Sequence, residues 1–221
     1  MSRRNNASLR CARCRMHQSL CVCALIPTLK TRTRVLLVIH RAEDRKPTNT
    51  GRLATECLVN SEVVVRGRRE TESAPLPIAE GTQPVLLYPA EDAVPLTELR
   101  FDRPVTLIVP DGNWRQASKV RNRVPGMREV PCATLPPRPL EPSVYRLRVE
   151  AHDHGLATIE AIARALGILD GDAIEQALML PFRAMVERTL WARGDLRDHE
   201  VTGGIPDGVM RHDPSSGTFA R

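Results

Sequence analysis

The sequence predicts an α/β protein with a mostly parallel β-sheet, flanking helices and a small amino-terminal zinc module. Short apolar runs alternate with helical patterns, which is typical of a parallel sheet, and four cysteines lie within thirteen residues near the start. With 221 residues, of which 42% are hydrophobic, the chain can form one substantial core. We expect a zinc-binding segment over residues 1–30, a main domain over 31–193 and a flexible, glycine-rich tail over 194–221.

Short apolar or β-branched runs predict the strands of the sheet. They cover residues 35–39, 63–65, 84–88 and 104–109, and residues 143–149 are expected to be extended. The run at 104–109 is apolar at almost every position, as in a strand that is covered on both faces. Because ligands bind at the carboxyl ends of such strands, we expect functional residues in the loops that follow them.

Helices are expected over residues 49–58 and 112–121, and two further helices close the main domain. The first closing helix is indicated by apolar residues at helical spacing, namely Leu156, Ile159, Ile162 and Leu166. Gly167 is expected to end this helix, because glycine favours the position just after a helix terminus. The second begins near Asp170 and contains Pro181, which either kinks it or opens a further turn.

The cysteines form the second strong pattern, and four of them are close in sequence: Cys11, Cys14, Cys21 and Cys23. Four thiolates at this spacing suit one tetrahedral Zn²⁺, and a site closed by four cysteines is structural. The alternative is two disulfides, which need an oxidising compartment. The start of the chain lacks the apolar centre of a signal peptide, so we expect a cytoplasmic protein and favour zinc. Cys57 and Cys132 stand alone and are expected to be core residues.

Positive charge is concentrated in the first part of the chain. Residues 1–52 hold twelve lysines and arginines against two acidic residues, a balance of +10, whereas the whole chain carries +6. Such a local excess is typical of a nucleic-acid-binding protein, although a general preference for arginine is a simpler alternative. No stretch approaches the ~20 apolar residues of a membrane span, so no membrane partner is expected.

Residues with useful side-chain chemistry cluster after the predicted strands, in four segments. They are His40, Asn49, Thr50 and Arg52; then Leu87, Tyr88 and Pro89; then Pro110, Asp111, Gly112 and Trp114; and finally Tyr145, Leu156, Thr158 and Glu160. Each segment has an ordinary alternative explanation, such as an N-capping turn or the packing of an aromatic ring. Four such segments after four strands indicate a binding site, in which an aromatic ring can stack on a base and a helix N-terminus can meet an anion.

The motifs of the chain also occur in a particular order. Cys-x2-Cys, Cys-x-Cys, His-x2-Glu with Asn-Thr-Gly-Arg, Leu-Tyr-Pro, Asp-Gly-x-Trp and Leu-x-Thr-x-Glu-Ala resemble the DTW-domain family over residues 11–192. The resemblance implies a tRNA-uridine aminocarboxypropyltransferase, which moves the 3-amino-3-carboxypropyl group of S-adenosyl-L-methionine to N3 of a uridine and releases 5′-methylthioadenosine. It also implies a SPOUT-like sheet with a knotted cofactor site and, in the bacterial branch of the family, uridine 47 of the tRNA variable loop as target.

The resemblance and the chemistry of the reaction give each candidate residue an expected role. The uracil N3 proton must leave before the nitrogen attacks, so a carboxylate is expected as general base, with Asp111 as first choice and Glu160 as second. Trp114 would stack on the uracil or form a wall of the site. The expected cofactor-binding residues are Leu87, Tyr88, Pro89, Pro110, Asp111, Gly112, Tyr145, Leu156 and Thr158. The expected tRNA-binding residues are His40, Asn49, Thr50, Arg52, Arg115 and Lys119.

The chain departs from the family pattern at two positions, and two other functions stay open. It has Asn113 where the family usually has Thr or Ser, and Ala157 where Ser is common, so a hydroxyl contact to the cofactor is lost at Ala157. One alternative function is a SPOUT-like RNA methyltransferase with the same cofactor. The other is a non-enzymatic, zinc-containing RNA-binding protein, in which Asp111, Trp114 and Glu160 would serve the fold.

Overall fold

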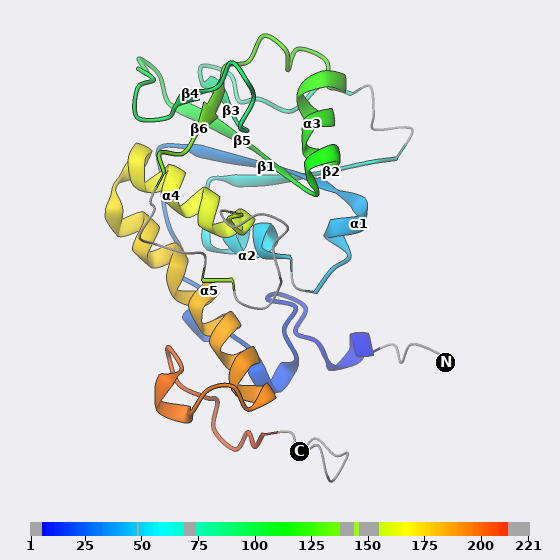
Figure 1. Cartoon of the computed structure of the whole chain (residues 1–221), viewed down its shortest axis with the longest axis vertical. Helices are drawn as coiled ribbons and strands as arrows, with labels where there is room; N and C mark the ends of the chain where they lie inside the picture. The colour runs from blue at the N-terminus through cyan, green and yellow to red at the C-terminus, as the bar shows by residue number, and fades with distance from the viewer. Residues whose placement is uncertain (1–5, 48, 69–73, 138–143, 146–154, 212–221) are drawn as a thin grey trace.

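The centre of the protein is a six-stranded parallel β-sheet (Figure 1). The computed structural model describes residues 6–47, 49–68, 74–137, 144–145 and 155–211. Within these residues the strand order is β2-β1-β5-β3-β6-β4, and every strand pair is parallel, as the sequence predicts. The strands are β1 (Arg34–His40), β2 (Ser61–Arg66), β3 (Gln83–Leu87), β4 (Val94–Pro95), β5 (Val105–Asp111) and β6 (Cys132–Thr134).

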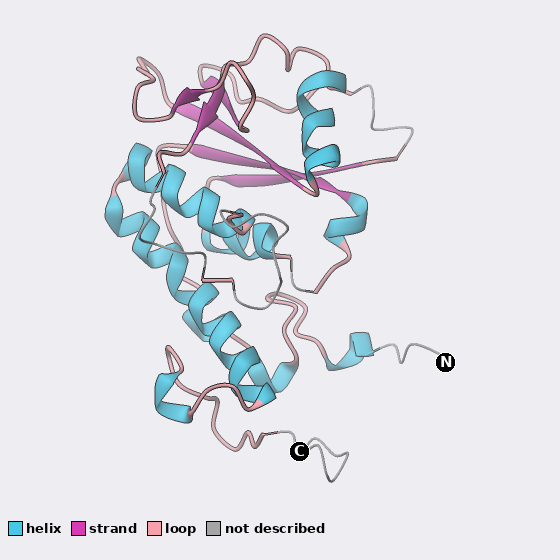
Figure 2. Cartoon of the chain, in the orientation of Figure 1, coloured by secondary structure: helices cyan, strands magenta, loops and turns pink. Residues whose placement is uncertain are grey.

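Helices cover both faces of the sheet, so the fold has three layers (Figure 2). The helices are α1 (Arg41–Asp44), α2 (Thr50–Cys57), α3 (Trp114–Arg123), α4 (Thr158–Asp170) and α5 (Asp172–Arg193). Helix α3 lies on one face, and α2, α4 and α5 lie on the other. Among the described helices, none has both the length and the apolar sequence needed to cross a bilayer.

Each face of the sheet has its own core. Leu36 and Ile108 point towards α3 and pack with its Val120, whereas Leu37 and Leu107 belong to the larger core under α2, α4 and α5. Successive residues of a strand point to opposite faces, so a strand buried on both sides needs an unbroken apolar run. This explains the mostly apolar sequence of β1 and β5, which lie in the middle of the sheet; the buried Thr106 is the polar exception in the interior of β5.

The prediction that Gly167 ends the first closing helix is wrong. Gly167 lies inside α4, which continues to Asp170, and Gly171 ends it with a φ of +112°. A Cβ at Gly167 would collide with the Glu175 side chain, so this glycine allows α4 and α5 to pack closely. Pro181 lies inside α5 and does not end that helix.

The segment after α5 is packed, in contrast to the expected flexible tail. Val201 is buried in the larger core, and the Trp191 indole Nε1 donates a hydrogen bond of 2.7 Å to Asp198 Oδ1. A few apolar and hydrogen-bonding residues therefore anchor residues 194–211 although most of that segment is polar. Residues 212–221 of the expected tail lie outside the described residues, as does most of the expected extended segment at 143–149.

Candidate functional site

Three of the four predicted segments meet at the carboxyl edge of the sheet. β1 ends at His40, β3 at Leu87 and β5 at Asp111, and β5 lies between the other two strands. In the β1–β5 register Ile39 is opposite Asp111, so the His40 and Asp111 segments emerge side by side. The fourth segment reaches the same edge through the N-terminus of α4, where Thr158 contacts Asp111. The sequence prediction of a shared edge is confirmed for these described residues.

The carboxylate of Asp111 is buried and held at both oxygens. Its residue is 9% exposed, Oδ2 accepts a hydrogen bond of 2.6 Å from Asn49 Nδ2, and Oδ1 accepts one of 2.7 Å from Thr158 Oγ1. These two donors come from the starts of α2 and α4, which are far apart in sequence. The carboxylate is therefore fixed in one orientation where three elements converge.

The first turn of α2 is shaped around this carboxylate. Asn49 caps the helix, because its Oδ1 accepts from the Arg52 backbone N–H at 2.9 Å while its Nδ2 donates to Asp111. A Cβ on Gly51 would lie 2.8 Å from Asp111 Oδ2 and 3.0 Å from Leu37 Cδ1. Glycine is therefore required at position 51 by close approach, and the Asn-Thr-Gly sequence has a direct geometric reason.

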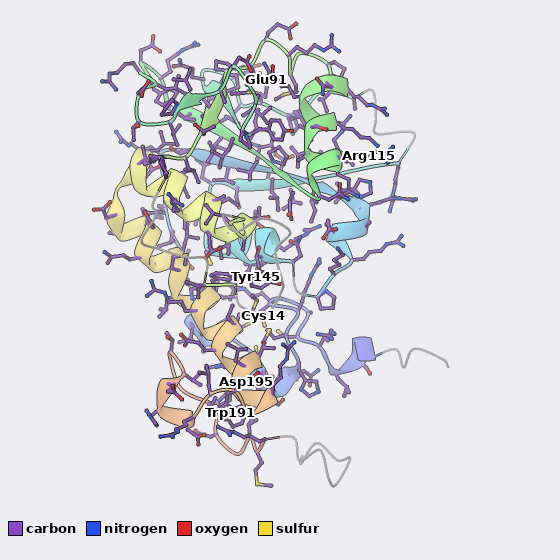
Figure 3. All side chains as sticks on the ribbon, in the orientation of Figure 1. Cys14, Glu91, Arg115, Tyr145, Trp191 and Asp195 are labelled. Atoms are coloured by element: carbon purple, nitrogen blue, oxygen red, sulfur yellow. The ribbon has the colours of Figure 1, made fainter. Side chains whose placement is uncertain are left out.

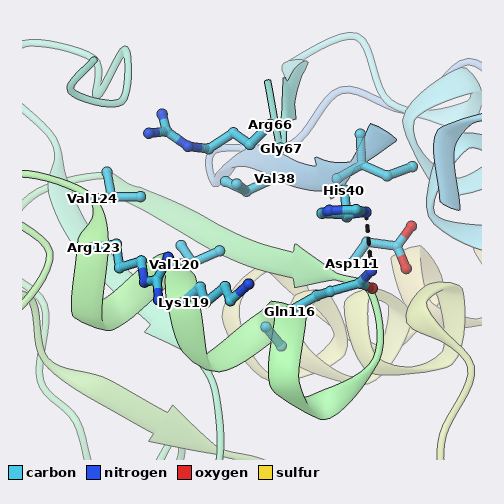
Figure 4. Close-up of a pocket in the computed structure, with 12 residues that line it drawn as sticks. Val38, His40, Arg66, Gly67, Asp111, Gln116, Lys119, Val120, Arg123 and Val124 are labelled. Atoms are coloured by element: carbon cyan, nitrogen blue, oxygen red, sulfur yellow. Dashed lines mark hydrogen bonds between the residues drawn. The ribbon is translucent and has the colours of Figure 1, made fainter. Parts of the chain in front are cut away.

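The turn after Asp111 is closed by a capping box. Asn113 Oδ1 accepts from the Gln116 backbone N–H, and Gln116 Oε1 accepts from the Asn113 N–H, both at 2.9 Å. Gln116 Nε2 also lies 3.0 Å from His40 Nδ1, which joins this turn to the end of β1 (Figure 4). Asn is as good an N-cap as Ser or Thr, so the departure at Asn113 keeps the start of α3, where Trp114 is the first residue.

Glu160 is buried and both of its oxygens accept backbone hydrogen bonds. Oε2 accepts from the Ala157 N–H at 2.8 Å, and Oε1 accepts from the Val144 N–H at 2.7 Å. Ala157 has no side-chain oxygen with which to cap α4, so Glu160 stabilises this end of the helix from within. Through these two hydrogen bonds Glu160 holds residues 144–145 against the start of α4.

The two predicted tyrosines lie in different surroundings. Tyr145 is 4% exposed, and its ring packs on Phe182 of α5 with 5.7 Å between centroids. Figure 3 labels it beside α5. Tyr88 is half-buried on the α3 face, whereas its neighbour Leu87 packs on the opposite face. The structure thus places the Tyr145 ring in the core rather than on an open surface.

Among the predicted tRNA-binding cations, Arg52 is ion-paired, Lys119 lines a pocket and Arg115 is exposed. Arg52 binds Asp44 through Nε at 2.8 Å and Nη2 at 2.6 Å. Lys119 and Arg123 of α3 instead line a small pocket of about 70 Å³ together with His40 and Arg66 (Figure 4). Arg115 is exposed near the start of α3 (Figure 3). Arg66 and Arg123 were not predicted as site residues, since nothing in the sequence brings them beside His40.

The four amino-terminal cysteines form one compact cluster. Their sulfur atoms all lie within 4.8 Å of one another, with 3.4 Å between Cys11 and Cys23 and 3.6 Å between Cys14 and Cys21. Four sulfurs at ~2.3 Å from a tetrahedral zinc would be roughly 3.8 Å apart, so the cluster fits this metal. The hydrogen bond from the Cys14 backbone lowers the pKa of Cys11 to about 6, whereas burial raises the pKa of Cys14.

The other two cysteines are core residues, as predicted. Cys57 is 1% exposed and Cys132 is 4% exposed. Burial raises the pKa of Cys57 to about 12, and burial also raises the pKa of Cys132. Neither thiol has the lowered pKa or the exposure of a reactive cysteine.

Arg188 is a buried residue that no sequence pattern singled out. It lies on α5, is 5% exposed and donates to the Cys21 carbonyl, to the Gly204 carbonyl at 2.9 Å and to the Gly203 carbonyl at 3.3 Å. Burial lowers its pKa. Its guanidinium therefore joins the cysteine module and the segment after α5 to the same helix.

Comparisons with known proteins agree on one family. The model of the family described as "DTW domain" matches residues 8–190. The tRNA-uridine aminocarboxypropyltransferase 2 of Macaca fascicularis is 29% identical over 210 residues, which cover 88% of this chain and 69% of that protein. The Mus musculus protein of the same name is 30% identical over 192 residues, with 79% and 61% covered.

More distant similarities involve a plant protein and a solved structure. The tRNA-uridine aminocarboxypropyltransferase A of Arabidopsis thaliana is 27% identical, with 80% of this chain and 79% of that protein covered. The solved structure is the SAM-dependent rRNA:acp-transferase Tsr3 from Vulcanisaeta distributa, at 16% identity and a TM-score of 0.42, with 73% and 79% of the two chains covered.

Proposed function

Because the chain belongs to the DTW-domain family, we propose that it is a tRNA-uridine aminocarboxypropyltransferase with S-adenosyl-L-methionine as donor. In this reaction the bond between the sulfonium and the aminocarboxypropyl carbon breaks while a bond from uridine N3 to that carbon forms. The sulfur keeps the electron pair and leaves as 5′-methylthioadenosine, and the N3 proton passes to a base. The target is a uridine of tRNA, with uridine 47 of the variable loop as the proposed position.

Asp111 is the residue that carries the proposal. It is a buried carboxylate at the carboxyl end of a central strand, which is where ligands bind in parallel sheets. Asn49 and Thr158 each occupy one acceptor position on its two oxygens. The two donors fix the orientation of the carboxylate, which a general base requires.

The donor substrate is proposed to lie between the loops after β3 and β5 and the start of α4. Leu87 ends β3, and Tyr88 and Pro89 follow it. Pro110 and Gly112 flank Asp111 at the end of β5, and Leu156 and Thr158 lie at the start of the α4 segment, at the same edge of the sheet. The positive end of the helix dipole of α4 favours the methionine carboxylate there. Tyr145 is proposed to act through its backbone, since its ring packs on Phe182.

Selectivity for the aminocarboxypropyl carbon is a matter of orientation. Three carbons flank the sulfonium, and the carbon in line with the uridine nitrogen reacts. Trp114 is proposed to position the uracil, because it directly follows the turn that Asn113 and Gln116 hold. A fixed turn beside a fixed carboxylate gives the nucleophile one direction of approach.

The tRNA is proposed to approach over α3 and the loop after β1. Lys119 and His40 line the pocket beside Asp111, and Arg115 lies exposed on the same helix. Asn49 and Thr50 are buried, so they are proposed to hold the site rather than to reach the RNA. Arg52 is proposed to reach a phosphate only by exchanging Asp44 for it.

The metal proposed for the cysteine cluster is a structural Zn²⁺ held by Cys11, Cys14, Cys21 and Cys23. Four thiolates leave no coordination position for a substrate, so the metal would stabilise the amino-terminal segment. The sulfonium is already an activated leaving group, and the residues of the sheet edge supply the orientation and the proton acceptor.

The test is incubation of the purified protein with S-adenosyl-L-methionine and unmodified tRNA. Nucleoside mass spectrometry should detect aminocarboxypropyl-uridine, and the small product should be 5′-methylthioadenosine. S-adenosylhomocysteine and a methylated base would identify a methyltransferase instead. Binding of tRNA without any binding of S-adenosyl-L-methionine would identify a non-enzymatic RNA-binding protein. Fragment mapping of the modified tRNA locates the uridine.

A further inference from the structure

A second pocket lies at the opposite edge of the sheet from Asp111. It has a volume of about 490 Å³, and its walls are the loop between β4 and β5, the last turn of α4 and the segment before β1. β5 runs from Val105 at this pocket to Asp111, six residues away, which is about 20 Å along a strand. In Figure 1 the last turn of α4 lies at the left end of the sheet, and α1, which follows β1, lies at the right end. We call this pocket at the amino ends of the strands the amino-edge pocket.

Three arginines line the amino-edge pocket: Arg32, Arg100 and Arg103. All three residues are exposed. Arg100 donates to the carbonyls of its own loop, at Thr97 and Leu99, and Arg32 Nη2 donates to the Leu169 carbonyl at 3.3 Å. Each guanidinium has five N–H groups, so both keep donors for a ligand.

The acidic group in the amino-edge pocket is a weak partner. Asp102 Oδ1 lies 3.8 Å from Arg103 Nε, and the two side chains are 84% and 59% exposed. An exposed pair at this distance contributes little and is easily exchanged. With three arginines and one aspartate, the lining carries a net positive charge of two.

The pocket also has an apolar floor. Leu96, Val105 and Ile168 belong to the larger core or pack on it, and Phe101 lies partly exposed among them. Guanidinium groups suit phosphate because they offer paired donors, and an aromatic ring offers a stacking surface to a base. The volume lies within the range of pockets that hold small molecules, roughly 300–1,000 Å³. The arginines suit a phosphate group and the apolar floor with Phe101 suits a flat ring, so the pocket suits a ligand that contains both.

We propose that the amino-edge pocket binds a nucleoside phosphate, with the phosphate on Arg100 and Arg103, a further contact from Arg32, and the base on Phe101. The source is either one nucleotide of an RNA or a free nucleotide. For an RNA source the inference rests on the proposed function, since the tRNA would then contact both edges of the sheet. Such a contact would increase affinity for tRNA without touching the reacting uridine.

The binding test compares two double variants of the full chain. Arg100→Ala with Arg103→Ala removes two cations from the pocket, and Arg193→Ala with Arg197→Ala removes two exposed cations at the far end of α5. Fluorescence anisotropy with labelled tRNA at several salt concentrations gives affinity and its salt dependence. The pocket variant should bind about tenfold more weakly at 0.1 M salt and lose about 1–2 from the slope of log K against log salt. The control variant should stay within about twofold of the wild type by the same relation.

Adenosine monophosphate tests the free-nucleotide source. If calorimetry detects its binding to the wild type and Arg100→Ala with Arg103→Ala removes that binding, the pocket accepts a nucleotide in isolation. If adenosine monophosphate does not bind but the pocket variant still loses tRNA affinity, the source is RNA. Phe101→Leu keeps the apolar floor and should weaken whichever ligand binds, because it removes the stacking ring.

The proposal is overturned if both double variants lose tRNA affinity equally, or if the pocket variant matches the wild type for tRNA and adenosine monophosphate. It is also overturned if the wild type binds neither. Product formation is measured separately. In an active enzyme the pocket variant should raise KM for tRNA and leave kcat unchanged. A protein whose pocket binds nucleotides but that forms no modified uridine would contradict the proposed function alone.

Discussion

The Asn49 side chain makes two hydrogen bonds: its oxygen caps α2 by accepting from the Arg52 N–H at 2.9 Å, and its amide nitrogen donates to Asp111 Oδ2 at 2.6 Å. A helix start and the end of a central strand are thereby joined through a single residue. The two hydrogen bonds use different atoms of the Asn49 side chain. Substitutions at position 49 are therefore expected to separate the capping of α2 from the positioning of the Asp111 carboxylate.

Comparison of Asn49→Ser with Asn49→Ala should separate the helix cap from the contact with Asp111. Serine caps a helix about as well as asparagine but is too short to hold Asp111. Asn49→Ser should therefore keep the helix cap, lose the about 1–3 kcal/mol of the buried hydrogen bond to Asp111, and lose transfer activity about tenfold. Asn49→Ala loses the cap as well and should be less stable than Asn49→Ser by about 1 kcal/mol in denaturant unfolding. Full activity in a stably folded Asn49→Ser protein would show that the contact with Asp111 has no part in the reaction.

The two carboxylates at the site should respond differently to amide replacement. Asp111→Asn should bind S-adenosyl-L-methionine normally by calorimetry but lose transfer to tRNA by about 10²–10⁴-fold, because the amide cannot take up the N3 proton. Glu160→Gln should instead be less stable by about 1–3 kcal/mol. Both Glu160 oxygens accept from backbone N–H groups, and the NH2 group of glutamine would leave one of these N–H groups without an acceptor. Its activity, measured below its melting temperature, should stay within about tenfold of wild type on the same argument. The reverse order of activities would make Glu160 the base.

The sequence could predict the central strands and the edge that holds Asp111, but not the contacts across that edge. β1 and β5 are buried on both faces, which leaves short, mostly apolar runs that are visible in sequence. The hydrogen bond between Asn49 and Asp111 joins residues 62 apart, and no local pattern encodes such a contact. β4 and β6 have two and three residues, which is too short for a recognisable alternation.

The errors in the sequence prediction have a common physical cause, which is packing between distant segments. Gly167 has the residue type of a helix end, but Glu175 packs where its side chain would be, and Gly171 ends the helix. The segment after α5 is polar and rich in glycine, yet Arg188 binds its carbonyls at Gly203 and Gly204. In both cases tertiary contacts decide the outcome and local composition does not.

Gly51→Ala should reduce activity more than stability. The added Cβ would lie 2.8 Å from Asp111 Oδ2, so the carboxylate must move, whereas alanine favours a helix over glycine by about 1 kcal/mol and offsets part of that strain. We expect at least a tenfold loss of aminocarboxypropyl-uridine formation with a melting temperature close to wild type.

Gly171→Ala is the matched control for this substitution. Its Cβ would meet nothing within 4 Å, but its φ of +112° is strained for alanine, so stability should fall by about 1–3 kcal/mol. Its activity in the folded state should be unchanged. Equal activity losses in the two variants would remove the case for a specific contact between position 51 and Asp111.

Cys14→Ser and Cys57→Ser should distinguish a metal ligand from a core thiol. Both cysteines are buried, but only Cys14 lies in the four-sulfur cluster. Plasma mass spectrometry should find about one zinc per chain in the wild type and in Cys57→Ser, and much less in Cys14→Ser. The melting temperature of Cys14→Ser should also fall, because Arg188 binds the Cys21 carbonyl and thus couples the cysteine module to α5. Equal zinc content in all three proteins would mean that the cluster does not hold the metal.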